Sequence, residues 1–186
     1  MSIFKASWII LKKTKLKENE EIVIVFTSEY WKLVLKNKIS KRQKNLDLWY
    51  IINFEINVKK ENQINEILNS KIKNEFQYNN KDFSLIIEYL ELIKFIENFT
   101  PLNMQILWIY EIFYKINDHK NLTYEKIIFS KIKILSLLWI LKNEENNNEI
   151  VKKIINFILK NSIDEILKLS WVDEKDLAIL KKITNI

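Results

Sequence analysis

The sequence predicts an α+β protein with two domains, a five-stranded β-barrel over residues 1–79 followed by an all-α domain over residues 80–186. A change in hydrophobic period carries this expectation, because apolar residues alternate with period two in the first part and recur with period 3.6 from Asp82 onward. A chain of 186 residues is long enough for one domain of ordinary size or for two small ones.

Short runs rich in β-branched residues make up the first part. The predicted strands cover residues 3–11, 22–27, 33–39 and 51–58, with a basic turn expected over residues 12–21. The fourth run alternates most clearly, with Ile52, Phe54 and Ile56 on one face. A weaker fifth candidate over residues 63–73 is equally compatible with a helix. Five short strands in this length favour a small barrel over an open sheet.

Helix start signals divide the second part. Asp82 and Thr123 are expected N-caps, Pro101 follows Thr100 at a first helical position, and Ser162 and Glu165 form a capping box. The predicted helices cover residues 82–96, 101–117, 123–141 and 150–159, then a short helix from 162 and a last one capped by Asp173. The third is nearly apolar all round in its second half, which predicts a central position.

The composition excludes several classes of protein. An apolar fraction of 48% is too high for a disordered chain. The absence of Cys excludes a disulfide scaffold, a Cys-ligated zinc site, an iron–sulfur cluster and thiol catalysis. No apolar run is long enough to span a membrane, and the first residues lack the pattern of a signal peptide. We therefore expect a cytoplasmic protein without membrane contact.

The net charge of +6 is confined to the first third of the chain. Residues 1–60 hold 13 Lys and Arg against 6 Asp and Glu, whereas residues 61–186 hold 17 against 18. A Lys-rich genome could produce a basic solvated surface, but such a bias should also have left the remainder basic. A localised basic surface attracts polyanions. The candidate DNA-contacting cations are Lys12, Lys13, Lys15, Lys17, Lys32, Lys36, Lys38, Lys41, Arg42 and Lys44.

Aromatic residues are interleaved with these cations, as in proteins that stack bases while cations follow the phosphates. Tyr30 lies beside a predicted turn and is the candidate for base stacking. Trp8 and Phe26 fall inside strand runs, so we expect them in the core.

No group of residues assembles an enzyme site. Without Gly there is no phosphate-cradling loop, and the only His, His119, is expected in a loop between helices. Glu88 and Glu91 lie three residues apart on one predicted helix, but they flank its apolar stripe and are expected to be solvated. No nucleophile is paired with a base. We expect a binding protein without catalytic residues, cofactor or metal.

Several stretches resemble the RecO family of bacterial recombination mediators. Residues 9–12 (IILK) and 18–27 (ENEEIVIVFT) resemble the first two strands of that family's N-terminal oligonucleotide-binding (OB) barrel. Residues 27–33 (TSEYWKL) are similar to its Thr-x-Glu-x-Gly-Lys-Leu hairpin, and residues 36–42 (KNKISKR) to its basic segment. In the second part, Tyr89–Ile93 resembles the family's first helix and Lys131–Leu141 its long central helix.

The resemblance implies an OB-fold-like barrel and a nucleoid-associated DNA repair protein. Such a protein binds single- and double-stranded DNA, anneals complementary strands and helps to load RecA together with RecR. The resemblance also implies that the helical domain binds the acidic, apolar C-terminal tail of single-strand-binding protein. Many members carry a four-Cys zinc module, which this chain lacks. The alternative is a helical adaptor of the replication machinery without direct DNA contact.

The absence of Gly coincides with six Trp residues. An average composition would give Gly about 7% of the residues. The chain is instead dominated by 34 Ile, 29 Lys and 22 Asn, as in AT-rich coding sequences. Trp31 stands where the RecO-like hairpin has Gly, and Trp139 where the family often reads Leu-Leu-Gly. We hypothesise that some or all Trp codons are UGA codons that the source lineage reads as Gly. The rivals are a lineage that reads UGA as Trp, or drift.

Overall fold

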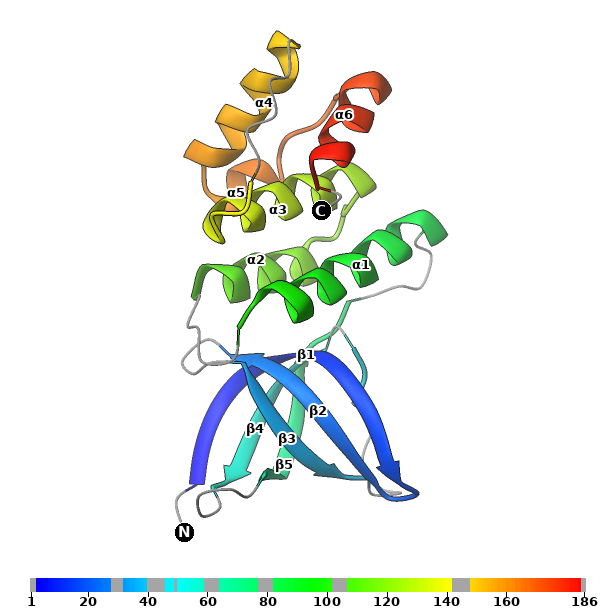
Figure 1. Cartoon of the computed structure of the whole chain (residues 1–186), viewed down its shortest axis with the longest axis vertical. Helices are drawn as coiled ribbons and strands as arrows, with labels where there is room; N and C mark the ends of the chain where they lie inside the picture. Colours follow the sequence, from blue (N-terminus) through cyan, green and yellow to red (C-terminus); the bar gives the residue numbers. More distant parts are fainter. Residues whose placement is uncertain are drawn as a thin grey trace. The chain divides into compact units, whose positions relative to one another are not determined.

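The computed structural model describes residues 3–27, 32–39, 46–48, 50–58, 64–76, 82–101, 107–141 and 148–184. Five strands precede six helices within these ranges, which confirms the predicted α+β architecture (Figure 1). The strands are β1 (Ile3–Lys17), β2 (Glu20–Thr27), β3 (Leu33–Lys38), β4 (Ile51–Asn57) and β5 (Asn65–Asn74). The helices are α1 (Phe83–Phe99), α2 (Leu107–Asp118), α3 (Tyr124–Leu137), α4 (Glu149–Lys160), α5 (Ile163–Ile166) and α6 (Glu174–Thr184).

The chain divides into two compact units. The barrel unit comprises Met1–Tyr78 and Ile93–Asp118, and the helical unit comprises Asn79–Leu92 and His119–Ile186. The end of α1 and all of α2 therefore group with the barrel. The boundary between residues 79 and 80 stays a prediction.

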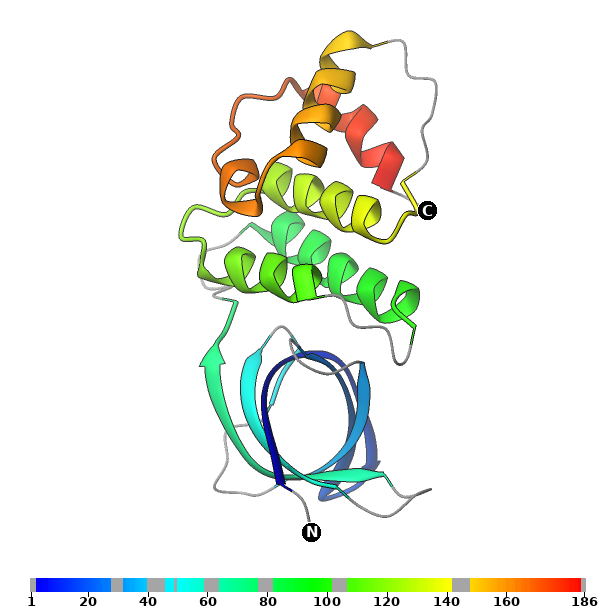
Figure 2. The ribbon, with the colours of Figure 1, turned by 90° about the vertical axis from the view of Figure 1, so that its left-hand side faces the viewer.

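The strands close into an OB-fold-like barrel in the order β1-β2-β3-β5-β4, which Figure 2 shows as a ring. All neighbours pair antiparallel except β3 and β5, which are parallel. Of residues 63–73, whose sequence is equally compatible with a strand and a helix, those from Asn65 onward belong to the strand β5, because β4 supplies a pairing partner along the length of this strand.

The predicted basic turn over residues 12–21 is wrong, because β1 continues to Lys17 and the turn contains only Glu18 and Asn19. This part of β1 has no apolar alternation. It is held instead by pairing with β2, where Lys15 lies opposite Glu21 and Lys17 opposite Glu20. Opposite charges on facing strands stabilise a ladder.

The barrel core confirms the predicted inward face of the fourth strand. Ile52, Phe54 and Ile56 are buried, and so are Trp8 and Phe26. The rings of Trp8 and Phe54 meet edge to face with their centroids 5.6 Å apart. Such aromatic pairs add to the free energy gained by burial.

The helical unit is built around α3, as its apolar sequence predicts. Eight of its residues are buried, and it packs against α4, α5 and α6. The capping box of Ser162 and Glu165 is present at the start of α5, and Asp173 accepts a bond from the Lys175 N–H at the start of α6. The third helix ends at Leu137 rather than at the predicted Leu141.

Candidate nucleic-acid interface

A bulge in β1 decides which lysines point outward. Ile10 pairs with Val25 and Lys12 with Ile24, so Leu11 is an extra residue between them. Because successive residues of a strand point to opposite sides, one inserted residue inverts the alternation that follows it. Lys12 therefore shares the outer side with Ile24, whereas Lys13 shares the inner side with the buried Val23.

Four lysines lie on the outer surface of β1, β2 and β3. Lys12, Ile24 and Val34 form one row across the three strands. A second extra residue, Leu16, inverts the alternation again, so Lys17 returns to the outer side and forms another row with Glu20 and Lys38. Lys36 lies between these rows on β3, opposite Ile22. We call Lys12, Lys17, Lys36 and Lys38 the outer lysine face. Glu97 of α1 binds Lys12 and Glu20 binds Lys36, so two carboxylates face four ammonium groups and the face keeps excess positive charge.

The pKa of Glu20 reflects the positive charge of this surface. Lys36 binds its carboxylate at 2.8 Å. This hydrogen bond and the positive charges of Lys36, Lys17 and Lys38 hold the pKa of the Glu20 carboxyl below its usual value. Three of the four lysines thus act together on one carboxylate. Sequence reasoning did not single out Glu20, although its place opposite Lys17 across a two-residue turn could have indicated it.

Two of the predicted DNA-contacting lysines belong to the inner side of the barrel instead. The Lys13 ammonium contacts the carbonyl of Leu46 and lies 3.8 Å from the Glu21 carboxylate. Asn37 donates to the same carboxylate at 2.8 Å. Lys15 pairs with Glu21 and so shares this side, at the exposed end of β1. We call Lys13, Glu21 and Asn37 the barrel plug. It satisfies a buried carboxylate, which burial alone would penalise.

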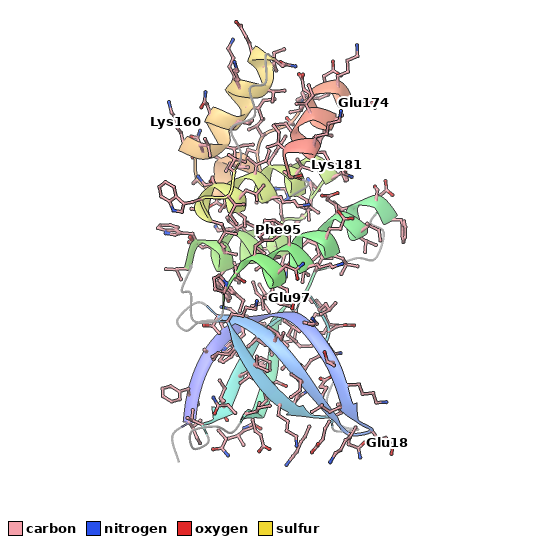
Figure 3. The ribbon with its side chains drawn as sticks, viewed as in Figure 1. Glu18, Phe95, Glu97, Lys160, Glu174 and Lys181 are labelled. Carbon is pink, nitrogen blue, oxygen red and sulfur yellow. The ribbon has the colours of Figure 1, made fainter. Side chains whose placement is uncertain are left out.

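Lys32 holds the end of a helix. It is 8% exposed, and its ammonium donates to the carbonyls of Glu97 and of Thr100, the latter at 2.8 Å. Both carbonyls belong to the C-terminal end of α1, whose last turn contains no basic residue of its own. Figure 3 labels Glu97, whose carboxylate also binds Lys12 at 3.2 Å. Burial lowers the pKa of Lys32. The prediction that Lys32 contacts DNA finds no support in this position.

The remaining predicted contacts lie outside the described residues. They are Tyr30, Lys41, Arg42 and Lys44, and Trp31 lies there as well. In the described part of the chain, the outer rows of β1, β2 and β3 carry the aliphatic residues Ile22, Ile24 and Val34. Tyr30 stays the predicted stacking residue.

The carboxylates Glu88 and Glu91 lie in different environments. Glu91 is exposed as expected, but the prediction that Glu88 is solvated is wrong, since it is 1% exposed. The Glu88 carboxylate lies 3.5 Å from the buried Lys131 ammonium and 3.3 Å from that of Lys181. The residue pattern of α1 alone could not reveal these partners, because Lys131 belongs to α3 and Lys181 to α6. His119 lies between α2 and α3, as predicted.

Two grooves offer less charge than the outer lysine face. One of about 460 Å³ lies over β1, β4 and β5 and contains Lys5, Glu55 and Lys71. Lys5 binds Glu55 at 2.9 Å, so Lys71 supplies the net charge. Hydrogen bonds from Asn69 and Lys5 lower the pKa of Glu55.

The other groove, of about 550 Å³, lies in the helical unit. Phe83 and Ile87 line it together with Glu88, Glu91 and Lys181, which is labelled in Figure 3. Glu88 is paired with Lys131 and Lys181, and the other charged lining residue is the exposed carboxylate Glu91, so this groove lacks the excess positive charge that would attract an acidic peptide. The expected site for the single-strand-binding protein tail stays unplaced.

The described ranges contain no group of three or more His, Cys, Asp or Glu residues that could hold a metal ion. Among the described helices, none combines the length and the apolar character needed to cross a membrane. Comparison with protein families and with curated proteins gives no match for this chain.

Proposed function

We propose that this chain is a recombination mediator of RecO type that acts in DNA repair through its barrel. It binds single- and double-stranded DNA, anneals complementary strands and helps to load RecA together with RecR. The observation that carries this proposal is the outer lysine face, which places two lysines on β1 and two on β3, on either side of β2, in an OB-fold-like barrel. In OB folds, the surface of the second and third strands binds oligonucleotides.

The arrangement of the lysines fits phosphate binding without sequence selection. Lys17 and Lys38 are exposed and have no ion pair with a described carboxylate, and Lys36 shares Glu20 with them. Flexible ammonium groups act as point charges toward phosphates, and the release of counterions supplies affinity that does not depend on base sequence. Neutralising the phosphates of two strands at once lowers their mutual repulsion, which is the physical requirement for annealing.

A triple variant tests the proposal. Lys17→Ala, Lys36→Ala and Lys38→Ala together should weaken binding to single-stranded DNA of any sequence. The log–log dependence of affinity on salt should flatten by up to about 2, since each phosphate contact on a single strand contributes about 0.7. The matched control removes three exposed lysines from α4, Lys152, Lys153 and Lys160. It has the same net charge, so it separates local contact from overall charge. Equal slopes in both variants would contradict the proposal.

The activity itself is tested by annealing complementary strands coated with single-strand-binding protein, with and without RecR. The wild-type chain should accelerate annealing, and the triple variant should lose most of this acceleration while the α4 control retains it. A chain that binds RecR or single-strand-binding protein but not DNA would instead support the helical adaptor.

A further inference from the structure

Two residues of the described chain have positive φ, and both are Trp. The φ angles are 59° for Trp139 and 71° for Trp171. This left-handed region crowds the Cβ atom against the backbone, so bulky residues are outliers there whereas Gly enters it freely. Only 6 of 186 residues are Trp, so two positions chosen regardless of residue type would both be Trp about once in a thousand cases.

Trp139 ends helix α3 in a hydrogen-bond pattern that favours Gly. The Ile140 N–H donates to the Leu135 carbonyl at 3.0 Å, and the Trp139 N–H donates to the Ser136 carbonyl at 3.1 Å. These two bonds define a Schellman motif with Trp139 at the C′ position. Helices that end in this way usually carry Gly there, because the residue must be left-handed.

Trp171 lies between α5 and α6, two residues before the capping Asp173. It shares a second property with Trp139, because the two are 97% and 94% exposed. An indole normally gains stability by burying a large apolar area. Trp8, which is fully buried, shows the ordinary behaviour within the same chain. At positions 139 and 171 the indole buries almost no apolar area, and the Cβ atom crowds the backbone because φ is positive.

We propose that residues 139 and 171 are Gly in the protein that the source cells make, encoded by UGA codons that those cells read as Gly. Writing such codons as Trp raises the number of Trp residues and lowers the number of Gly residues, which is the direction of the bias in a chain with six Trp and no Gly. Exposed Trp residues could also serve as anchors for a partner. Docking, however, gives no reason for a positive φ at both residues. The inference does not depend on the DNA-binding proposal.

The direct test is mass spectrometry of peptides from the protein purified from its source cells, together with sequencing of the gene. We expect the peptides spanning positions 139 and 171 to have the mass given by Gly, and both codons to be UGA. A Trp mass at either position, or UGG codons, would overturn the inference. The same spectra assign Trp31 and Trp49, which lie outside the described residues.

A stability measurement tests the structural argument independently. In the recombinant chain as written, Trp139→Gly and Trp171→Gly should each raise the folding equilibrium constant, by about 5- to 30-fold. Trp108→Gly is the matched control, because Trp108 is 63% exposed in the first turn of α2 and has no positive φ. Gly weakens helices, so this control should lower the folding constant. Losses at all three positions would contradict the argument.

Discussion

Replacing Lys32 with Met separates a structural lysine from a DNA-binding one. Met keeps much of the apolar stem but removes the ammonium that donates to the Glu97 and Thr100 carbonyls. Those carbonyls have no partner within α1, as at every helix C-terminus. Hydrogen bonds to charged groups contribute about 1.5–3 kcal/mol, and the loss of the charge near the helix end adds about 0.3–1 kcal/mol.

The desolvation of the Lys32 ammonium, which lowers its pKa, offsets part of this gain. We therefore expect Lys32→Met to lower the free energy of unfolding by about 2–3 kcal/mol. With a urea m-value of about 2 kcal/mol/M, the unfolding midpoint should fall by about 1–1.5 M. Far-UV circular dichroism during urea titration measures this shift.

Lys38→Met is the comparison variant, because Lys38 is exposed at the end of β3. It should leave the urea midpoint nearly unchanged and lower the salt slope of single-stranded DNA binding by about 0.7. Lys32→Met, assayed where it is folded, should leave that slope unchanged. A stable Lys32→Met variant with a reduced slope would refute the assignment of Lys32 to the end of α1.

Two further predictions concern carboxylates of the helical unit. Glu88→Ala should lower the free energy of unfolding by about 3–5 kcal/mol, because the buried Lys131 loses its counter-charge. Glu91→Ala, at an exposed position, should change the free energy of unfolding by about 0.5 kcal/mol or less. Equal urea midpoints for the two variants would show that the ion pair contributes nothing. The hydrogen bonds from Ser162 hold the pKa of the Glu165 carboxyl below its usual value. Their contribution to stability is therefore present above the unfolded-state pKa and is lost as the pH falls through the folded-state pKa. The stability difference between wild type and Glu165→Gln should therefore be present at neutral pH and shrink in acid, and a difference independent of pH would contradict this role.

The spacing of apolar residues along the sequence predicted the barrel and the helices, because this spacing depends on the local geometry of strands and helices. The alternation of Ile52, Phe54 and Ile56 was enough to predict the inward face of β4. The spacing of Ser162 and Glu165 was enough to predict the start of a helix. The fifth strand could not be decided in this way, since its assignment depends on pairing with β4. The same limit applies to Glu88, whose partners come from distant helices.

The candidate interface was predicted as a charge excess and not as a surface. Lys12 and Lys13 are neighbours in sequence, yet the bulge at Leu11 sends one to the outer lysine face and the other to the barrel plug. Lys32 lies in the same basic stretch of the sequence as Lys36 and Lys38 but binds the end of α1, because its acceptors are carbonyls more than sixty residues away. Composition counts charges, whereas only the fold assigns their partners.

The parallel seam of the barrel has a consequence for motion. Described residues of β3 and β5 pair only at Leu35 with Asn65 and at Lys36 with Glu66, whereas β1 pairs with β2 and β4 along many residues. A seam held by so few pairs opens at a lower free energy than the rest of the barrel. Strand β3, however, pairs with β2 along all of its residues, so Lys36 and Lys38 stay in register with β2 when β5 separates from β3. Opening of the seam would therefore expose the edges of β3 and β5 while the lysines of the outer lysine face keep their spacing.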